Sequence, residues 1–356
     1  MPDRSYIDAL IRDFDTELPR LRERRIDSVF FGGGTPSLFQ PEDFSRLLVA
    51  LRQRIAFGDD AEVTLEANPG TIEHGRFAGY REAGINRVSL GAQTFAPRAL
   101  EVLGRIHSAD DTHRAVAELR AAGLHNFNLD LMYALPGQTL DEALEDVRIA
   151  SALEPSHISY YQLTLEPGTV FHARPPPLPD EDAAWRIQSA GQKFLADAGY
   201  MQYEVSAYAR EGARCRHNLN YWAFGDYVGV GAGAHGKISL ALPQGILRTT
   251  KPKQPREYQD QTRLAGTSLA GAAAIGEGSC ILPQDLPFEF MLNALRLNEG
   301  FTTQDYRRRT GLDIISIAGK LAAAEERGLL EDRSDGWRPT DLGRRFLNDL
   351  QGSFLP

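Results

Sequence analysis

The chain has 356 residues, of which 42% are hydrophobic and 24% charged, as in ordinary globular proteins. Its formal net charge of -9 argues against a nucleic-acid-binding protein, since such proteins usually carry a clustered excess of Lys and Arg. No apolar run approaches the ~20 residues of a membrane span, and the N-terminal residues are polar rather than typical of a signal peptide. We therefore expect a cytoplasmic protein with no membrane span and no nucleic-acid partner.

The first two thirds of the chain alternate short β-like runs with amphipathic helices. The predicted strands are residues 26–31, 63–66, 87–90, 127–132, 158–163 and, more weakly, 202–205. A first helix is expected over residues 6–18. In the next one, residues 44–55, apolar side chains recur at the spacing of a buried stripe. Regular β–α alternation indicates parallel strands with helical crossovers, in either an open sheet or a barrel.

Later helices have recognisable ends. A helix is predicted to begin after Thr139, because Glu142 stands three residues on and completes a capping box. Another begins at Pro97 and stops near Gly104, and Gly199 ends a helix that starts at Asp180.

Polar or glycine-rich groups follow the predicted strands. The first strand leads into Gly32–Gly34, and the later ones end near Glu66, Gln93, Asp130 and Thr164. In a parallel barrel the carboxyl ends of the strands meet at one rim, where such folds keep their active sites. The sequence therefore predicts a ligand site at this rim.

The pattern changes after residue 205. An aromatic and glycine-rich segment ends near Gly236, and a polar stretch follows to about residue 285. From Leu286 onward two apolar helix faces indicate a compact winged-helix-like module, for which a packing role is favoured over DNA binding. The predicted division is residues 1–236, a connecting segment 237–285, and a C-terminal domain 286–356.

Five motifs in fixed order make the sequence recognisable: FFGGGTPS (30–37), EANP (66–69), SLGAQTF (89–95), LGRIH (103–107) and NLDLMYALPGQT (128–139). The three glycines are neither a phosphate loop nor a dinucleotide fingerprint. Together the motifs resemble the oxygen-independent coproporphyrinogen III oxidase group of the radical S-adenosylmethionine superfamily. The resemblance implies an α/β fold, a partial (β/α)6 TIM-like barrel, here without its first strand.

The resemblance also implies a set of S-adenosylmethionine contacts. The residues at matching positions are Gly33, Gly34, Thr35, Glu66, Gln93, Arg105, Asp130, Thr164 and His235. A cationic sulfonium ligand with an amino-acid tail suits carboxylates together with amide and guanidinium donors. An internal salt bridge is the alternative explanation for Arg105 and Asp130.

The segment HNLNYW, residues 217–222, resembles the His-Asn-x-x-Tyr-Trp block of the haem-chaperone branch of this group. His217, Asn218, Tyr221 and Trp222 are therefore candidate haem-binding residues. A histidine can ligate haem iron, and aromatic rings offer a flat surface to a porphyrin. The alternative is a packed histidine beside aromatic side chains; Cys215 is a weaker candidate ligand.

The chain departs from its relatives in its cysteines. Only Cys215 and Cys280 occur, whereas the family holds a [4Fe-4S] cluster with a Cys-x-x-x-Cys-x-x-Cys loop expected before the first helix. We expect no radical chemistry from this chain, and an unpaired edge beside the strand at 26–31. Either the start is assigned too far downstream, or the protein is a cluster-less descendant.

Three functions follow from these observations. The first is a haem chaperone that binds haem and passes it to acceptor proteins, with S-adenosylmethionine and a [4Fe-4S] cluster in the full-length form. Contact with membrane haem proteins and a homodimer are compatible with it. The second is coproporphyrinogen III oxidase, and the third is a degenerate barrel that binds a small molecule.

Overall fold

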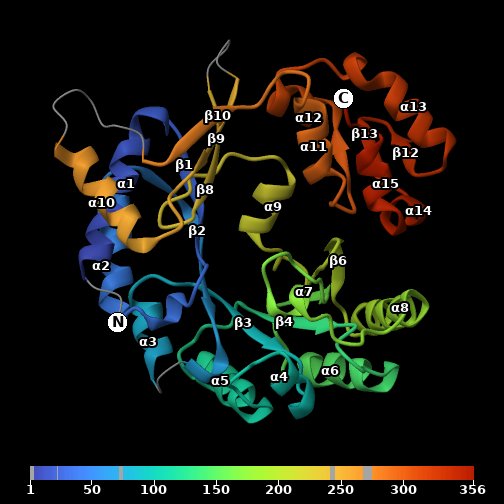
Figure 1. Cartoon of the computed structure of the whole chain (residues 1–356), viewed down its shortest axis with the longest axis horizontal. Helices are drawn as coiled ribbons and strands as arrows, with labels where there is room; N and C mark the ends of the chain where they lie inside the picture. The colour runs from blue at the N-terminus through green and yellow to red at the C-terminus, as the bar shows by residue number, and fades with distance from the viewer. Residues whose placement is uncertain (1–3, 22, 72–74, 241–244, 268–274) are drawn as a thin grey trace. The chain divides into compact units, whose positions relative to one another are not determined.

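A seven-stranded sheet in the order β1-β2-β3-β4-β5-β7-β6 organises the first part of the chain (Figure 1). The computed structural model describes residues 4–21, 23–71, 75–240, 245–267 and 275–356. The strands are β1 (Arg25–Phe31), β2 (Ala56–Ala67), β3 (Arg87–Gln93), β4 (Phe127–Tyr133), β5 (His157–Gln162), β6 (Met201–Glu204) and β7 (Ala207–Ala209). Strands β2 to β5 pair in parallel, as the predicted partial barrel requires, and β1 stands at the edge of this order.

The far edge of the sheet differs from the predicted parallel series. The segment predicted as the last strand is β6, and it forms an antiparallel hairpin with β7, which in turn pairs antiparallel with β5. Only Val205 and Ser206 join the two strands. A parallel crossover needs about a dozen residues, and a connection as short as this one allows only a hairpin.

Two compact units share the chain. The first unit consists of the described residues within 28–45 and 60–215. The second unit consists of those within 2–27, 46–59 and 216–356. The first unit contains α3 (Arg76–Glu82), α4 (Pro97–Val102), α5 (Ala109–Ala121), α6 (Leu140–Ala152), α7 (Val170–Ala173) and α8 (Glu181–Asp197). Helix α2 (Pro41–Arg52) runs from the first into the second.

The sheet of the first unit has two unlike faces. On one face Leu65, Val88, Leu129 and Ile158 are fully buried, and α5, α6 and α8 cover their strands. Capping boxes at Ser108 and Thr139 begin α5 and α6, the second as predicted. Each such cap stabilises a helix by about 1 kcal/mol. The opposite face carries polar side chains, described below.

The second unit joins the N-terminal helix to a late part of the chain. Helix α1 (Arg4–Leu21) packs on α10 (Pro255–Thr267). Between them lies a buried ionic group, in which Lys251 Nζ is 2.7 Å from Asp13 Oδ1 and 2.8 Å from Glu17 Oε1. The Tyr258 hydroxyl donates to Asp13 Oδ2 at 2.8 Å. Because the charges are paired and hydrogen-bonded, the helix can bury them.

A small antiparallel sheet was not predicted from the sequence. It has the order β10-β9-β8, with β8 (His235–Ser239), β9 (Ile246–Thr250) and β10 (Glu277–Cys280). Residues 241–244 and 268–274, which belong to the predicted connecting segment, lie outside the described residues. Helix α9 (Arg216–Trp222) precedes this sheet and packs against α11 (Leu286–Ala294).

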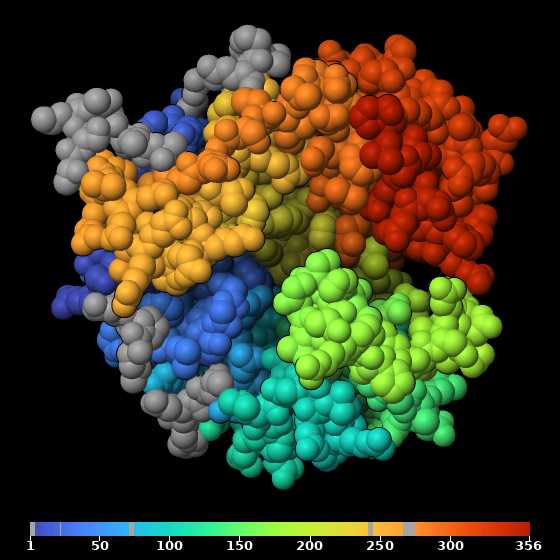
Figure 2. Space-filling view, viewed as in Figure 1, coloured from blue at the N-terminus to red at the C-terminus, as the bar shows by residue number. Residues whose placement is uncertain are grey.

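The C-terminal module is winged-helix-like, as predicted. It contains α11, α12 (Thr303–Thr310), α13 (Ala318–Glu326), α14 (Asp341–Arg345), α15 (Leu347–Gly352) and the sheet β11-β13-β12, with β11 (Phe301–Thr302), β12 (Leu330–Arg333) and β13 (Gly336–Pro339). Its atoms, orange to red, form a contiguous body in Figure 2. On α11 the buried face contains Phe290 and Met291, whereas Leu292 is 41% exposed.

In the part of the chain that the structure describes, every helix is too short or too polar to cross a bilayer.

Candidate functional site

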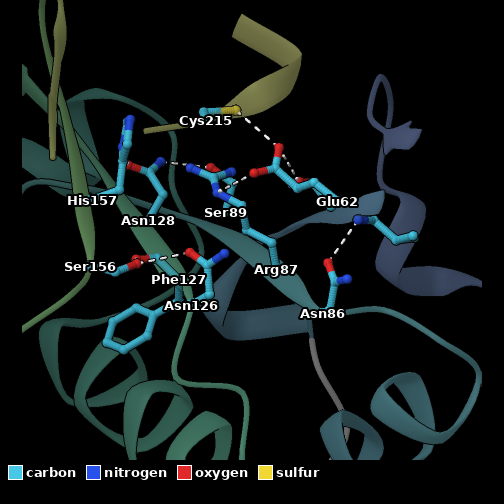
Figure 3. A network of polar contacts seen from close by, with 12 residues as sticks. Glu62, Asn86, Arg87, Ser89, Asn126, Phe127, Asn128, Ser156, His157 and Cys215 are labelled. Atoms are coloured by element: carbon cyan, nitrogen blue, oxygen red, sulfur yellow. Dashed lines mark hydrogen bonds and ion pairs between the residues drawn. The ribbon is translucent and has the colours of Figure 1, made fainter. Parts of the chain in front are cut away.

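A ladder of polar side chains crosses the second face of the first unit's sheet. Register places Glu66 beside Ser89, Ser89 beside Asn128, and Asn128 beside His157 on four parallel strands. Because side chains alternate along a strand, all four point to the same face. Asp130 and Ser159 form the next rung on β4 and β5. Figure 3 shows part of this polar layer, which also includes Arg87, Glu62 and Cys215.

The hydrogen bonds of this polar ladder have a fixed direction. The Cys215 backbone N–H donates to the Tyr203 hydroxyl, which lies 2.8 Å from His157 Nε2. His157 Nδ1 lies 2.6 Å from Asn128 Oδ1, and Asn128 Nδ2 donates to Asp130 Oδ1 at 2.9 Å. Asn128 Oδ1 can only accept, so Nδ1 carries the histidine proton and Nε2 accepts from Tyr203. The chain of donors therefore ends at the Asp130 carboxylate.

Burial determines the protonation of His157 and Asp130, two members of the ladder. It holds the pKa of His157 well below its usual value, with Arg87 adding repulsion, so the imidazole is neutral. It raises the pKa of Asp130, although hydrogen bonds from Asn128, Ser159 and Ser89 oppose the shift. Neither His157 nor Tyr203 was predicted as a site residue, because both lie within strands that look apolar in the sequence.

Predicted site residues gather near the carboxyl ends of β2, β3 and β4. Burial raises the pKa of Glu66, and the nearby charge of Asp130 adds to the shift. Arg105 Nη1 donates to Asn68 Oδ1 at 3.3 Å, so its described hydrogen bond is to an amide rather than to the carboxylate of an internal salt bridge. The Tyr161 hydroxyl donates to Gln93 Oε1 at 2.9 Å and interacts electrostatically with Glu66, Asp130 and Arg105. Tyr161 and Asn68 were not predicted as site residues.

The glycine turn meets this group of residues. The backbone N–H of Gly33 donates to Glu66 Oε2 at 3.2 Å, and Gly33 has a φ of 106°, which favours glycine. Gly34 is exposed, and Thr35 precedes a short 3-10 helix (Pro36–Leu38). The turn thus presents backbone beside a carboxylate, as the predicted close approach of a ligand requires.

Gln93 has an unusual backbone conformation. Its φ is 65°, in the left-handed region that non-glycine residues seldom adopt. Directly after it, Asp146 holds the turn, since Oδ2 accepts from the Thr94 hydroxyl and Oδ1 from the Phe95 N–H, both at 2.7 Å. Burial raises the pKa of Asp146 to about 6. Local strain of this kind, held by surrounding bonds, is frequent at functional sites.

Two further predicted S-adenosylmethionine contacts are Thr164 and His235. Thr164 is exposed, and its hydroxyl donates to Glu166 Oε1 at 3.0 Å. His235 begins β8 in the second unit, where Nδ1 is 3.2 Å from Thr250 Oγ1. Neither side chain has a described contact with Glu66, Gln93 or Asp130.

The predicted haem residues form an aromatic cluster on α9 in the second unit. The His217 and Tyr221 ring centroids are 5.0 Å apart, and Tyr221 stacks on Tyr227 at 4.2 Å. Trp222 lies 6.3 Å from Tyr221 on the other side, and Asn218 is half-buried on the same helix. None of the α9 residues is fully buried, so their rings remain accessible. We call His217, Tyr221, Trp222 and Tyr227 the α9 aromatic cluster.

The cysteines do not form a metal site. Cys215 is buried, and its thiol donates to Glu62 at 3.5 Å, while Cys280 is exposed on β10. Within the described ranges, no group of three or more His, Cys, Asp or Glu side chains could hold a metal ion. A [4Fe-4S] cluster needs at least three thiolates, and this sequence has two cysteines, so its residues do not fit the cluster.

Comparisons with known proteins agree with this arrangement. The sequence is 46% identical over the whole chain to the protein named Heme chaperone HemW of Haemophilus influenzae, and 44% identical to that of Escherichia coli. In both cases the chain covers 91% of the relative. The chain belongs to the HemW family. A mitochondrial radical S-adenosyl methionine domain-containing protein of Mus musculus is 36% identical, with 98% of this chain and 80% of the relative covered.

Family profiles and a solved structure place HemW-type chains in a wider group. The Radical SAM superfamily profile matches residues 4–150, and the HemN C-terminal domain profile matches residues 281–346. The structure of coproporphyrinogen III oxidase (HemN) from Escherichia coli aligns over 98% of this chain and 82% of its own, with a TM-score of 0.78 and 22% identity. At that identity the likeness concerns the fold, and it confirms the partial barrel.

Proposed function

We propose that this chain is a haem chaperone, which binds haem at the α9 aromatic cluster and passes it to acceptor proteins. The observation that carries the proposal is the full-length similarity to proteins named haem chaperones, together with an accessible histidine beside three aromatic rings. His217 is the proposed axial ligand of the haem iron, and Tyr221 and Trp222 offer apolar surface to the porphyrin. Asn218 is assigned to the same site.

S-adenosylmethionine is the second proposed ligand, at the strand ends of the first unit. Burial raises the pKa of both Glu66 and Asp130, and a cationic ligand beside them would favour their ionised forms. The Gly33–Thr35 turn, Gln93 and Arg105 supply further donors and acceptors, while Thr164 and His235 stay proposed contacts. When bound near a [4Fe-4S] cluster, this cofactor supplies radical chemistry. The residues of this chain do not fit such a cluster, so its proposed role here is that of a bound ligand.

A cytoplasmic location, delivery to acceptors that include membrane haem proteins, and a homodimer belong to the same proposal.

The test is a haem titration of the chain and of His217→Ala, followed by absorbance. We expect the substitution to shift the Soret band and to weaken binding about tenfold, because the iron loses a ligand. His125→Ala, at an exposed histidine outside the α9 aromatic cluster, is the matched control and should bind like the parent. Identical spectra and affinities for the parent and His217→Ala would contradict the role of His217.

A further inference from the structure

Two arginine side chains flank the α9 aromatic cluster. The guanidinium carbon of Arg296 lies 4.1 Å from the Trp222 ring centroid. Arg248 Nη1 lies 3.5 Å from the hydroxyl of Tyr227, whose ring stacks on Tyr221. Arg248 belongs to β9, and Arg296 follows α11, so both start from ordered elements of the second unit. Two of the rings in the α9 aromatic cluster therefore each have an arginine side chain beside them.

The cations near this cluster have carboxylate partners. Arg248 Nη2 pairs with Glu289 on α11, and Lys237 pairs with Asp226 at 3.1 Å. Even so, the pKa of Lys237 falls to about 8, mainly through burial, with repulsion from Arg309 and Arg248 opposing the attraction of Asp226. The low pKa of Lys237 therefore reflects its burial, and Arg248 keeps a carboxylate partner in Glu289.

Several donors near α9 also lack an acceptor. Trp222 Nε1, Arg248 Nε and Arg309 Nε are buried nitrogen atoms without a hydrogen-bond partner among the described residues. Burying a donor without a partner is unfavourable, and a carboxylate offers about four acceptor positions. The side chain of Arg248 is 37% exposed, so its guanidinium can still be reached from solvent. The chemistry that fits these donors is an anionic oxygen ligand.

We infer that Arg248 and Arg296 bind the carboxylate side chains of a porphyrin whose ring lies on the α9 aromatic cluster. The inference rests on the proposed haem-binding function and deepens it, because it adds a specificity for porphyrin carboxylates. Haem combines an apolar disc with two propionates, and the cluster combines aromatic rings with two guanidinium groups. Arginine suits this role because its planar fork matches a carboxylate, and its charge strengthens each hydrogen bond.

The test compares haem with haem dimethyl ester, in which both carboxylates are blocked. The intact chain is expected to bind haem about tenfold more tightly than the ester, the worth of one charge-assisted hydrogen bond. Arg248→Met should remove most of that preference while leaving ester affinity unchanged, and Arg248→Lys should restore part of it. Arg327→Met, at an exposed arginine on the C-terminal module, is the matched control and should keep the preference.

The outcomes separate the two proposals. Equal affinity of the intact chain for haem and its ester would overturn carboxylate recognition while leaving haem binding intact. Equal losses of both ligands in a folded Arg248→Met protein would overturn the role of Arg248. If the intact chain binds neither porphyrin, the haem-binding function itself fails, and this inference fails with it.

Discussion

The polar ladder of the first unit and the α9 aromatic cluster of the second use polar groups in opposite ways. In the ladder, His157 and Asn128 are buried and each is hydrogen-bonded to defined partners. In the cluster no α9 residue is fully buried, and Trp222 Nε1 and Arg248 Nε lack acceptors. A satisfied network holds side chains rigidly, whereas accessible rings with unmet donors suit a large ligand that is bound and released.

The largest effect is expected from breaking the ladder at its centre. His157→Leu leaves the Tyr203 hydroxyl and Asn128 Oδ1 buried without this partner. We expect the free energy of unfolding, from urea titration followed by circular dichroism, to fall by about 3 kcal/mol. His125→Leu, at an exposed position of the same unit, is the control, with an expected change within about 0.5 kcal/mol. Similar losses in both variants would show that the ladder is not a stabilising network.

A smaller effect depends on pH. The pKa of Asp146 is raised from 3.8 to about 6, so between these values the folded chain holds a proton that the unfolded chain has released. Stability from this group is therefore present at low pH and lost as pH rises through the window. Relative to Asp146→Asn, the free energy of unfolding of the parent should fall by about 2 kcal/mol between pH 4 and 7.

Lys237 is the matched control for this pH dependence. Burial lowers its pKa from 10.5 to about 8, so its contribution to stability changes only above pH 8, where the free energy of unfolding rises with pH. Lys237→Arg, which keeps the positive charge beside Asp226, should therefore show a constant offset from the parent between pH 4 and 7. A constant offset for Asp146→Asn as well would mean that this carboxyl titrates normally in the folded chain.

The smallest effect compares two hydroxyl groups. Tyr203→Phe removes the hydroxyl between His157 and the Cys215 N–H, whereas Tyr227→Phe removes a hydroxyl that Arg248 approaches at 3.5 Å and that also interacts with Tyr221. Denaturant unfolding should give a loss of about 1 kcal/mol for the first variant and less than about 0.5 kcal/mol for the second. The reverse order would contradict the contrast between a satisfied ladder and an accessible cluster.

Local signals account for what the sequence predicted. Strand positions followed from short apolar runs, and the start of α6 followed from Thr139 and Glu142, because both partners of a capping box lie within one turn. Glu66, Gln93 and Asp130 were predicted at strand ends, and the structure brings them near one another. Their ligand, and that of His217, stay proposals. The boundaries at residues 236 and 285 also stay predictions.

Non-local pairing explains what the sequence did not predict. Tyr161 reaches Gln93 from a strand 68 positions away, and no short pattern announces such a pair. In the sheet of β8, β9 and β10, the sequence of β10 is Glu-Gly-Ser-Cys, which shows no alternation of large apolar residues. All four of its residues are exposed. The left-handed backbone of Gln93 is likewise imposed by its surroundings, including Asp146, rather than by a residue type that prefers it.

The buried bond between Lys251 and Asp13 has a consequence for synthesis. These residues stand 238 positions apart, so α1 leaves the ribosome long before its partner exists. At about 5–20 residues per second, the interval is on the order of 10–50 s. Throughout it, Asp13 and Glu17 remain hydrated on an unpacked amphipathic helix. Helix α1 is therefore fixed only after Lys251 has been translated, and this unit cannot be completed before then.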